Sequence, residues 1–286
     1  MISIPLTIAG LLIGLMLGLT GGGGSLLSVP ALLYLAELSV KDAVANSLAI
    51  VSLTSFFALV LLAKRKNIDW RVGLIFSGVS VIGAFLGAKL AIYVPGLVIL
   101  TLFYLVMLAS GFTMIEKTKL KQPAERVHDV SAFKLTSLGL ALGAFTGLVG
   151  AGGGFLVVPA LIIYAGLTMK IAVGTSLLVV SLKSLAAFIG YSSHATIDYA
   201  LIGYVAALAA VGASGGVLIG TRISEVKLQF LFGLTIFVTA MFLAAYEIIN
   251  WLDNAHAVPP AISLGILILF YSTIVLTLYK RVSRKV

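Results

Sequence analysis

The sequence predicts an all-α integral membrane protein with two inverted-topology repeats, each opening with a glycine-broken re-entrant hairpin, and a final unpaired transmembrane helix. Three observations support this prediction. Hydrophobic residues make up 60% of the 286 residues and charged residues 10%, whereas soluble domains carry about 25% charge. The apolar runs are long enough to cross a bilayer as helices and lack the period-2 alternation of barrel strands. A glycine-rich phrase also occurs twice, which indicates an internal duplication.

The duplicated glycine-rich segment aligns the two halves of the chain. When residues 19–53 are compared with residues 148–182, 19 of 35 positions are identical. In each copy a run of glycines is followed by Val-Pro-Ala-Leu. We therefore treat 1–286 as a single transmembrane domain that contains repeat 1 at 5–115 and repeat 2 at 134–249.

Five apolar segments are expected in each repeat. In repeat 1 they span 6–22, 26–37, 43–63, 70–94 and 97–115, and in repeat 2 they span 134–150, 154–166, 171–191, 198–221 and 228–249. A polar linker at 116–133 separates the halves, and an extra transmembrane helix is expected at 260–279. Asp69 and Asp198 occupy matched positions before apolar segments, where they are expected to act as helix N-caps.

The second segment of each repeat is short. Segments 26–37 and 154–166 correspond to roughly 18–20 Å of helix, less than the hydrocarbon core of about 30 Å. We therefore expect the first two segments of each repeat to form a re-entrant hairpin, which leaves seven full spans. Two full crossings are the alternative, and they would leave the orientation of the other spans unchanged.

Lysine and arginine predict the orientation. The loop 64–67 holds three basic residues, whereas the equivalent loop 192–195 holds no fixed charge. Because basic loops face the cytoplasm, the two repeats are predicted to be inverted. The N-terminus is then outside, and the linker and C-terminus are cytoplasmic. The net charge of +9 is explained by these loops, so the expected partner is the lipid bilayer and not nucleic acid.

The two glycine turns form the predicted binding site. Helices that start after them would aim N–H groups and the positive end of the helix dipole at the turn, as oxyanion sites do. Close helix packing is the alternative role for glycine, but a run of glycines breaks a helix, whereas packing needs them spaced. The predicted turn residues are Gly21, Gly22, Gly23, Gly24 and Ser25 in repeat 1, and Gly150, Gly152, Gly153 and Gly154 in repeat 2.

Polar residues at matched positions follow the turns. Early in the next segment these are Asn46 and Ser47 in repeat 1, and Thr175 and Ser176 in repeat 2. Further along, Ser52, Thr54 and Ser55 match Ser181, Lys183 and Ser184. Hydroxyl and amide groups can donate to an oxyanion, although such hydroxyls can instead bond their own helix backbone.

Lys183 lies near the middle of its segment, where a charge is costly and usually functional. We expect it to face the substrate; snorkelling to the surface is the alternative. All ten acidic residues fall in loops or near segment ends, which disfavours cation transport. The chain has no cysteine, and its three histidines form no metal-spaced cluster. We therefore expect no metal and no other cofactor.

The repeated turn, followed by Val-Pro-Ala-Leu and then Ala-Val-x-x-Ser-Leu, resembles the TauE/SafE (sulfite exporter) family of bacterial membrane transport proteins. The likeness covers about residues 5–280. It implies transport of sulfur-containing anions such as sulfite or organosulfonates, with the substrate at the two turns and the polar pairs after them. Ala151 interrupts the second glycine run, and Thr175 replaces Asn46, so an asymmetric substrate would suit the site.

These observations predict a secondary transporter or facilitator for a small anionic substrate, and the resemblance implies that it lies in the bacterial inner membrane. An enzyme is not expected, because no nucleophile–base pair or metal cluster is visible within the segments. The alternatives are an anion channel and a transporter of another small organic or inorganic anion. A homo-oligomer is left open.

Overall fold

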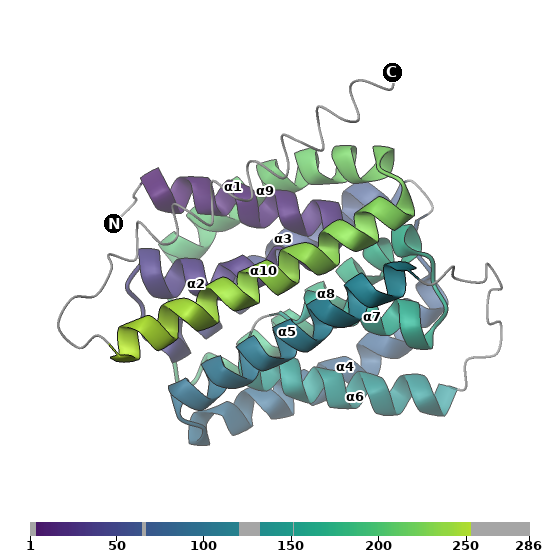
Figure 1. The fold of residues 1–286 in the computed structure, drawn as a ribbon. Coiled ribbons are helices and arrows are strands. Elements are labelled where there is room, and N and C mark those ends of the chain that lie inside the picture. Colours follow the sequence, from purple (N-terminus) through teal and green to yellow (C-terminus); the bar gives the residue numbers. More distant parts are fainter. Residues whose placement is uncertain (1–3, 65–66, 120–131, 151, 253–286) are drawn as a thin grey trace.

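The computed structural model describes residues 4–64, 67–119, 132–150 and 152–252 (Figure 1). Within these residues the chain is helical and forms no strand. The α-helices are α1 (Ile4–Thr20), α2 (Ser25–Leu35), α3 (Val40–Ala63), α4 (Trp70–Leu90), α5 (Gly96–Lys119), α6 (Ala132–Val149), α7 (Gly154–Tyr164), α8 (Met169–Tyr191), α9 (Tyr199–Arg222) and α10 (Glu225–Leu252). A short 3-10 helix, Ala91–Tyr93, follows α4.

Six helices of the described part are long and apolar enough to cross a membrane: α3, α4, α5, α8, α9 and α10. They coincide with six of the seven predicted spans. The seventh span, at 260–279, lies outside the described residues, and so does most of the linker. Helix α5 continues to Lys119 and α6 begins at Ala132, so both ends of the predicted linker are helical. The chain is therefore a multi-pass membrane protein, while the orientation of its termini stays a prediction.

The second helix of each repeat is short in the structure. Helices α2 and α7 each contain 11 residues, which corresponds to about 16 Å. Each contains a proline, Pro30 in α2 and Pro159 in α7. That each helix is too short to span the bilayer is confirmed. That each hairpin returns to the side it entered stays a prediction.

The two halves of the chain interlock. Helix α1 packs along α9, and its counterpart α6 packs along α4, the counterpart of α9. Helix α3 packs on α8, and α5 on α10, so these helices meet their own counterparts. In Figure 1 the α1–α9 pair lies along one edge and the α4–α6 pair along the opposite edge. The packing is thus equivalent in the two repeats; their inversion relative to a bilayer stays a prediction.

Helices α3 and α8 form the centre of this arrangement. Their apolar windows are 72% and 78% buried inside the protein, compared with 44–50% for the other four candidate spans. Polar residues near their N-termini are fully buried: Asn46 and Ser47 in α3, and Thr175 and Ser176 in α8. Any site between the repeats must therefore involve α3 and α8.

Aspartate side chains cap the N-termini of α4 and α9, as predicted. The Asp69 carboxylate accepts a hydrogen bond from the Val72 N–H group at 3.0 Å, and the Asp198 carboxylate accepts one from the Leu201 N–H group at 2.9 Å. These bonds satisfy N–H groups that lack a partner within the helix. Both N-cap predictions are confirmed.

Candidate functional site

The two glycine turns lie in direct contact. A Cβ atom added to Gly22 would overlap the backbone of Gly154, and one added to Gly154 would overlap the Cα atom of Gly22. Only glycine permits two backbones to approach this closely. Both residues are buried. The N-termini of α2 and α7 therefore meet inside the protein, as the repeat predicts, and the depth of this contact in a bilayer stays a prediction.

Ser47 and Ser176 join each turn to the opposite repeat. The Ser47 hydroxyl lies 3.1 Å from the carbonyl oxygen of Gly150, and the Ser176 hydroxyl lies 3.0 Å from that of Gly21. Gly21 and Gly150 both have φ of 74°, in the left-handed region that favours glycine. Each serine also lies 2.8 Å from a carbonyl oxygen of its own helix. The two serines therefore support the turns from both sides.

Asn46 and Thr175 contact loops instead of the turns. The Asn46 amide donates to the Thr196 carbonyl oxygen at 2.9 Å and accepts from the Asp198 N–H group at 2.9 Å. The Thr175 hydroxyl accepts from the Asp69 N–H group at 2.9 Å. The structure thus assigns these two predicted site residues to equivalent hydrogen bonds that hold the loops before α9 and α4.

The first turn largely satisfies its own polar groups. The Gly23 N–H group donates to the Thr20 hydroxyl at 2.9 Å, and the Ser25 hydroxyl donates to the Gly22 carbonyl oxygen at 2.8 Å. Gly24 has helical dihedral angles and precedes α2 directly. Thr54, at the position equivalent to Lys183, bonds the Ile50 carbonyl oxygen of its own helix. This half-site is neutral.

The second turn has a buried lysine side chain beside it. Lys183 is 1% exposed, and its ammonium donates to the Thr146 hydroxyl at 3.1 Å. A Cβ atom on Gly153 would lie 2.7 Å from the Lys183 Nζ atom, so the ammonium faces the start of α7. In the described part of the chain no carboxylate forms an ion pair with it. Lys183 therefore points into the protein, and the described side chain does not snorkel.

A hydroxyl without a partner faces the same turn. The Ser184 hydroxyl oxygen would lie 3.2 Å from a Cβ atom on Gly152, and this buried hydroxyl has no hydrogen-bond partner among the described residues. Its counterpart Ser55 is also buried and unpartnered. A buried polar group without a partner costs about 1–3 kcal/mol. Such a group next to a lysine and a helix N-terminus suits a ligand that accepts hydrogen bonds.

Two residues of this half-site were not among the predicted site residues. Ser184 could have been included, because its match to Ser55 placed it beside the other paired polar positions. Thr146 gave no such signal, since the equivalent position in repeat 1 is Leu17. Only the packing of α6 against α8 brings Thr146 to Lys183.

The described residues contain no group of histidine, cysteine, aspartate or glutamate side chains that could hold a metal ion. The polar groups gathered at the turns are instead donors: an ammonium, hydroxyls and the N–H groups at the start of α7. Hydrogen-bond donors around a positive charge are suited to a small oxyanion.

Comparisons with known proteins agree with this arrangement. The model of the family "Sulfite exporter TauE/SafE" matches residues 6–243. A "Probable membrane transporter protein" of Xylella fastidiosa is 34% identical over 239 residues, covering 82% of this chain and 92% of the relative. Relatives described in the same words are 27% identical in Bacillus subtilis, over 80% of this chain and 93% of theirs, and 29% identical in Methanocaldococcus jannaschii, over 70% and 76%. No solved structure matches the chain. The chain belongs to the sulfite exporter TauE/SafE family of membrane transporters.

Proposed function

We propose that the protein is a secondary transporter or facilitator for sulfur-containing anions, such as sulfite or organosulfonates, in a bacterial inner membrane. The anion binds beside the contact between the two glycine turns. The observation that carries this proposal is the Lys183 ammonium, which is buried at the start of α7 without a carboxylate partner in the described part of the chain.

The electrostatics favour an anion at this position. A buried charge without a counter-charge costs several kcal/mol, and a bound anion would supply that counter-charge. The first backbone bonds that close α7 come from the Leu156 and Val157 N–H groups, which both donate to the Gly153 carbonyl oxygen at 3.1 Å. The N–H groups at the first positions of α7 precede these bonds and are oriented toward the turn. With the Ser184 hydroxyl, they would surround an oxyanion.

The inequality of the half-sites supports an asymmetric substrate. Each repeat has a buried serine without a described partner, Ser55 or Ser184, but only the second repeat adds a lysine, Lys183. In the first repeat Thr54 and Ser25 bond the protein's own backbone. The oxyanion group of a sulfonate would bind at the second turn, and its uncharged part would extend toward the first. Sulfate, which has no uncharged part, is expected to be a weaker substrate.

Transport requires the turns to separate. Because Gly22 and Gly154 touch and are buried, an anion reaches the site only when one repeat moves against the other. Inverted repeats with re-entrant hairpins would open the site to the two sides in turn. The N-terminus would lie outside and the C-terminus in the cytoplasm. An anion current through a permanently open pore would contradict this mechanism and favour the channel alternative.

The test is flux in proteoliposomes. Purified protein is reconstituted, and uptake of sulfite, thiosulfate, sulfate, taurine and methanesulfonate is measured with and without a pH gradient. We expect saturable uptake of sulfite or of a small sulfonate, with sulfate weaker. Absence of flux for every sulfur-containing anion would overturn the substrate class, and uptake of another organic or inorganic anion in the same assay would identify the alternative.

A further inference from the structure

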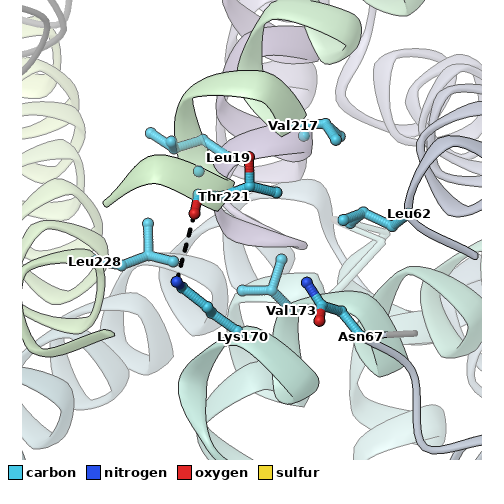
Figure 2. Close-up of a pocket in the computed structure, with 10 residues that line it drawn as sticks. Leu19, Leu62, Asn67, Lys170, Val173, Val217, Thr221 and Leu228 are labelled. Carbon is cyan, nitrogen blue, oxygen red and sulfur yellow. Dashed lines mark hydrogen bonds between the residues drawn. The ribbon is translucent and has the colours of Figure 1, made fainter. Parts of the chain in front are cut away.

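A pocket lies away from the contact between the turns, at the end of α1 and α9 (Figure 2). Its lining includes Leu19, Leu62, Asn67, Lys170, Val173 and Thr221. Asn67 belongs to the basic loop 64–67, and Lys170 lies in the first turn of α8. The pocket is therefore lined by three polar residues, Asn67, Lys170 and Thr221, together with apolar side chains.

The pocket adjoins the first glycine turn. Leu19 precedes Gly21 by two residues in the chain. Val173 contacts the same turn, because a Cβ atom on Gly21 would lie 2.8 Å from the Val173 Cα atom. Val173 and Leu19 thus separate the pocket from the glycine turn by one layer of residues. A ligand in the pocket would therefore lie close to the first glycine turn.

Lys170 retains donor capacity in this pocket. Its ammonium lies 3.4 Å from the Thr221 carbonyl oxygen, the contact drawn in Figure 2. The equivalent lysine of repeat 1, Lys41, makes a shorter bond of 2.7 Å to the Ile92 carbonyl oxygen. A lysine ammonium carries three donors, and no carboxylate pairs with Lys170 among the residues that the structure describes. Lys170 is partly buried and lines the pocket.

A buried tyrosine lies at the equivalent position in the other repeat. Tyr191 stands where repeat 1 has Leu62, and its hydroxyl donates to the Leu148 carbonyl oxygen at 2.8 Å. Leu148 is the counterpart of Leu19. Tyr191 is 1% exposed and packs in a core with Val44, the counterpart of Val173. The molecule therefore has a pocket beside one turn and a tyrosine side chain beside the other.

We propose that the Lys170 pocket is an outer binding site where a small oxyanion rests on its way to or from the first glycine turn. Lys170 supplies the positive charge, and the Asn67 amide supplies a further donor. Tyr191 closes the equivalent route on the side of Lys41. This inference rests on the proposed function for the identity of the transported anion, but the pocket's preference for anions can be measured without transport.

The test uses the absence of cysteine from the chain. Asn67→Cys places one thiol in the pocket, and Thr196→Cys places one at the equivalent position in the other repeat. Each is labelled with two methanethiosulfonate reagents, one bearing a sulfonate and one bearing a trimethylammonium group. When each rate is divided by the rate with a free thiol, we expect the anionic reagent to react at Asn67→Cys at least about fivefold faster than the cationic one, since one nearby unit charge in a solvated pocket contributes a factor of this order. Thr196→Cys, which lies beside the Asp42 carboxylate, should show no such preference. Methanesulfonate should slow this reaction.

Two further variants assign the effect to the pocket. Adding Lys170→Gln to Asn67→Cys should lower the preference for the anionic reagent several-fold, whereas adding Lys41→Gln should leave it. Part of the preference should remain, because Lys64, Arg65 and Lys66 precede Asn67 in the chain. Adding Leu62→Tyr should protect the thiol, because the tyrosine would fill the pocket as Tyr191 fills its counterpart. The proposal is overturned if the thiol does not react, if no charge preference is seen, or if Lys170→Gln leaves the preference intact.

Failure of the two proposals can be distinguished. If the protein moves no sulfur-containing anion yet Asn67→Cys shows a Lys170-dependent preference, the substrate class is wrong and the anion pocket stands. If the protein transports sulfite or a sulfonate but the thiol shows no charge preference, the pocket proposal alone is wrong.

Discussion

Replacing Gly22 by alanine tests the contact between the two turns. The added methyl group would meet the Gly154 backbone, and its neighbours there are main-chain atoms. Carbon atoms prefer separations of about 3.5–4.0 Å, so the two turns would have to part. No side chain can rotate to relieve the overlap. We therefore expect a loss at the upper end of the range for overpacking, about 3 kcal/mol.

The assay is thermal unfolding of the purified protein in detergent, followed by flux in proteoliposomes. A loss of about 3 kcal/mol corresponds to a fall in melting temperature on the order of 10 °C for a chain of this size. Gly78→Ala is the matched control, because a Cβ atom at this helical position meets nothing within 4 Å; it should gain up to about 1 kcal/mol. If Gly22→Ala melts like Gly78→Ala and still transports, the turns do not pack as described.

Three further predictions concern matched positions. Ser47→Ala and Ser176→Ala remove equivalent bonds to the opposite turn, so each should lower stability by about 1 kcal/mol; a large difference between their melting temperatures would contradict the equivalence. Ser184→Ala removes a hydroxyl without a described partner, so flux should fall while the melting temperature holds, and the reverse pattern would mean a structural role. Glu37 has φ of 55° where repeat 2 has Gly166 with φ of 63°, so Glu37→Gly should stabilise by about 1 kcal/mol, and no gain on melting would count against strain at this position.

The sequence predicted the meeting of the turns because the repeat constrains backbone geometry. Two aligned copies of one glycine-rich segment imply two similar turns. Because the helix after each turn is too short to span the bilayer, both turns were expected inside the membrane and close to each other. The six long helices were also predictable, since the length and hydropathy of each apolar run are given directly by the sequence. The spans and the contact between Gly22 and Gly154 follow from these regularities.

The directions of single side chains could not be predicted in this way. Asn46 and Ser47 are neighbours in α3, yet one bonds the loop before α9 and the other the turn at Gly150. Successive residues on a helix point about 100° apart, and the packing of the opposite repeat decides which of them reaches the turn. Thr146 contacts Lys183 for the same reason. No repeat pattern encodes a contact that occurs in only one half.

The central claim is that Lys183 binds the transported anion, and flux through Lys183→Met tests it most directly. Thr54→Val is the control at the equivalent position of repeat 1, where the hydroxyl bonds its own helix. We predict that Lys183→Met folds with an unchanged or higher melting temperature, because a buried ammonium without a carboxylate partner is removed. Its flux of sulfite or sulfonate should fall on the order of 100-fold, and Thr54→Val should transport normally. Flux through Lys183→Met at the level of the unaltered protein would contradict the account.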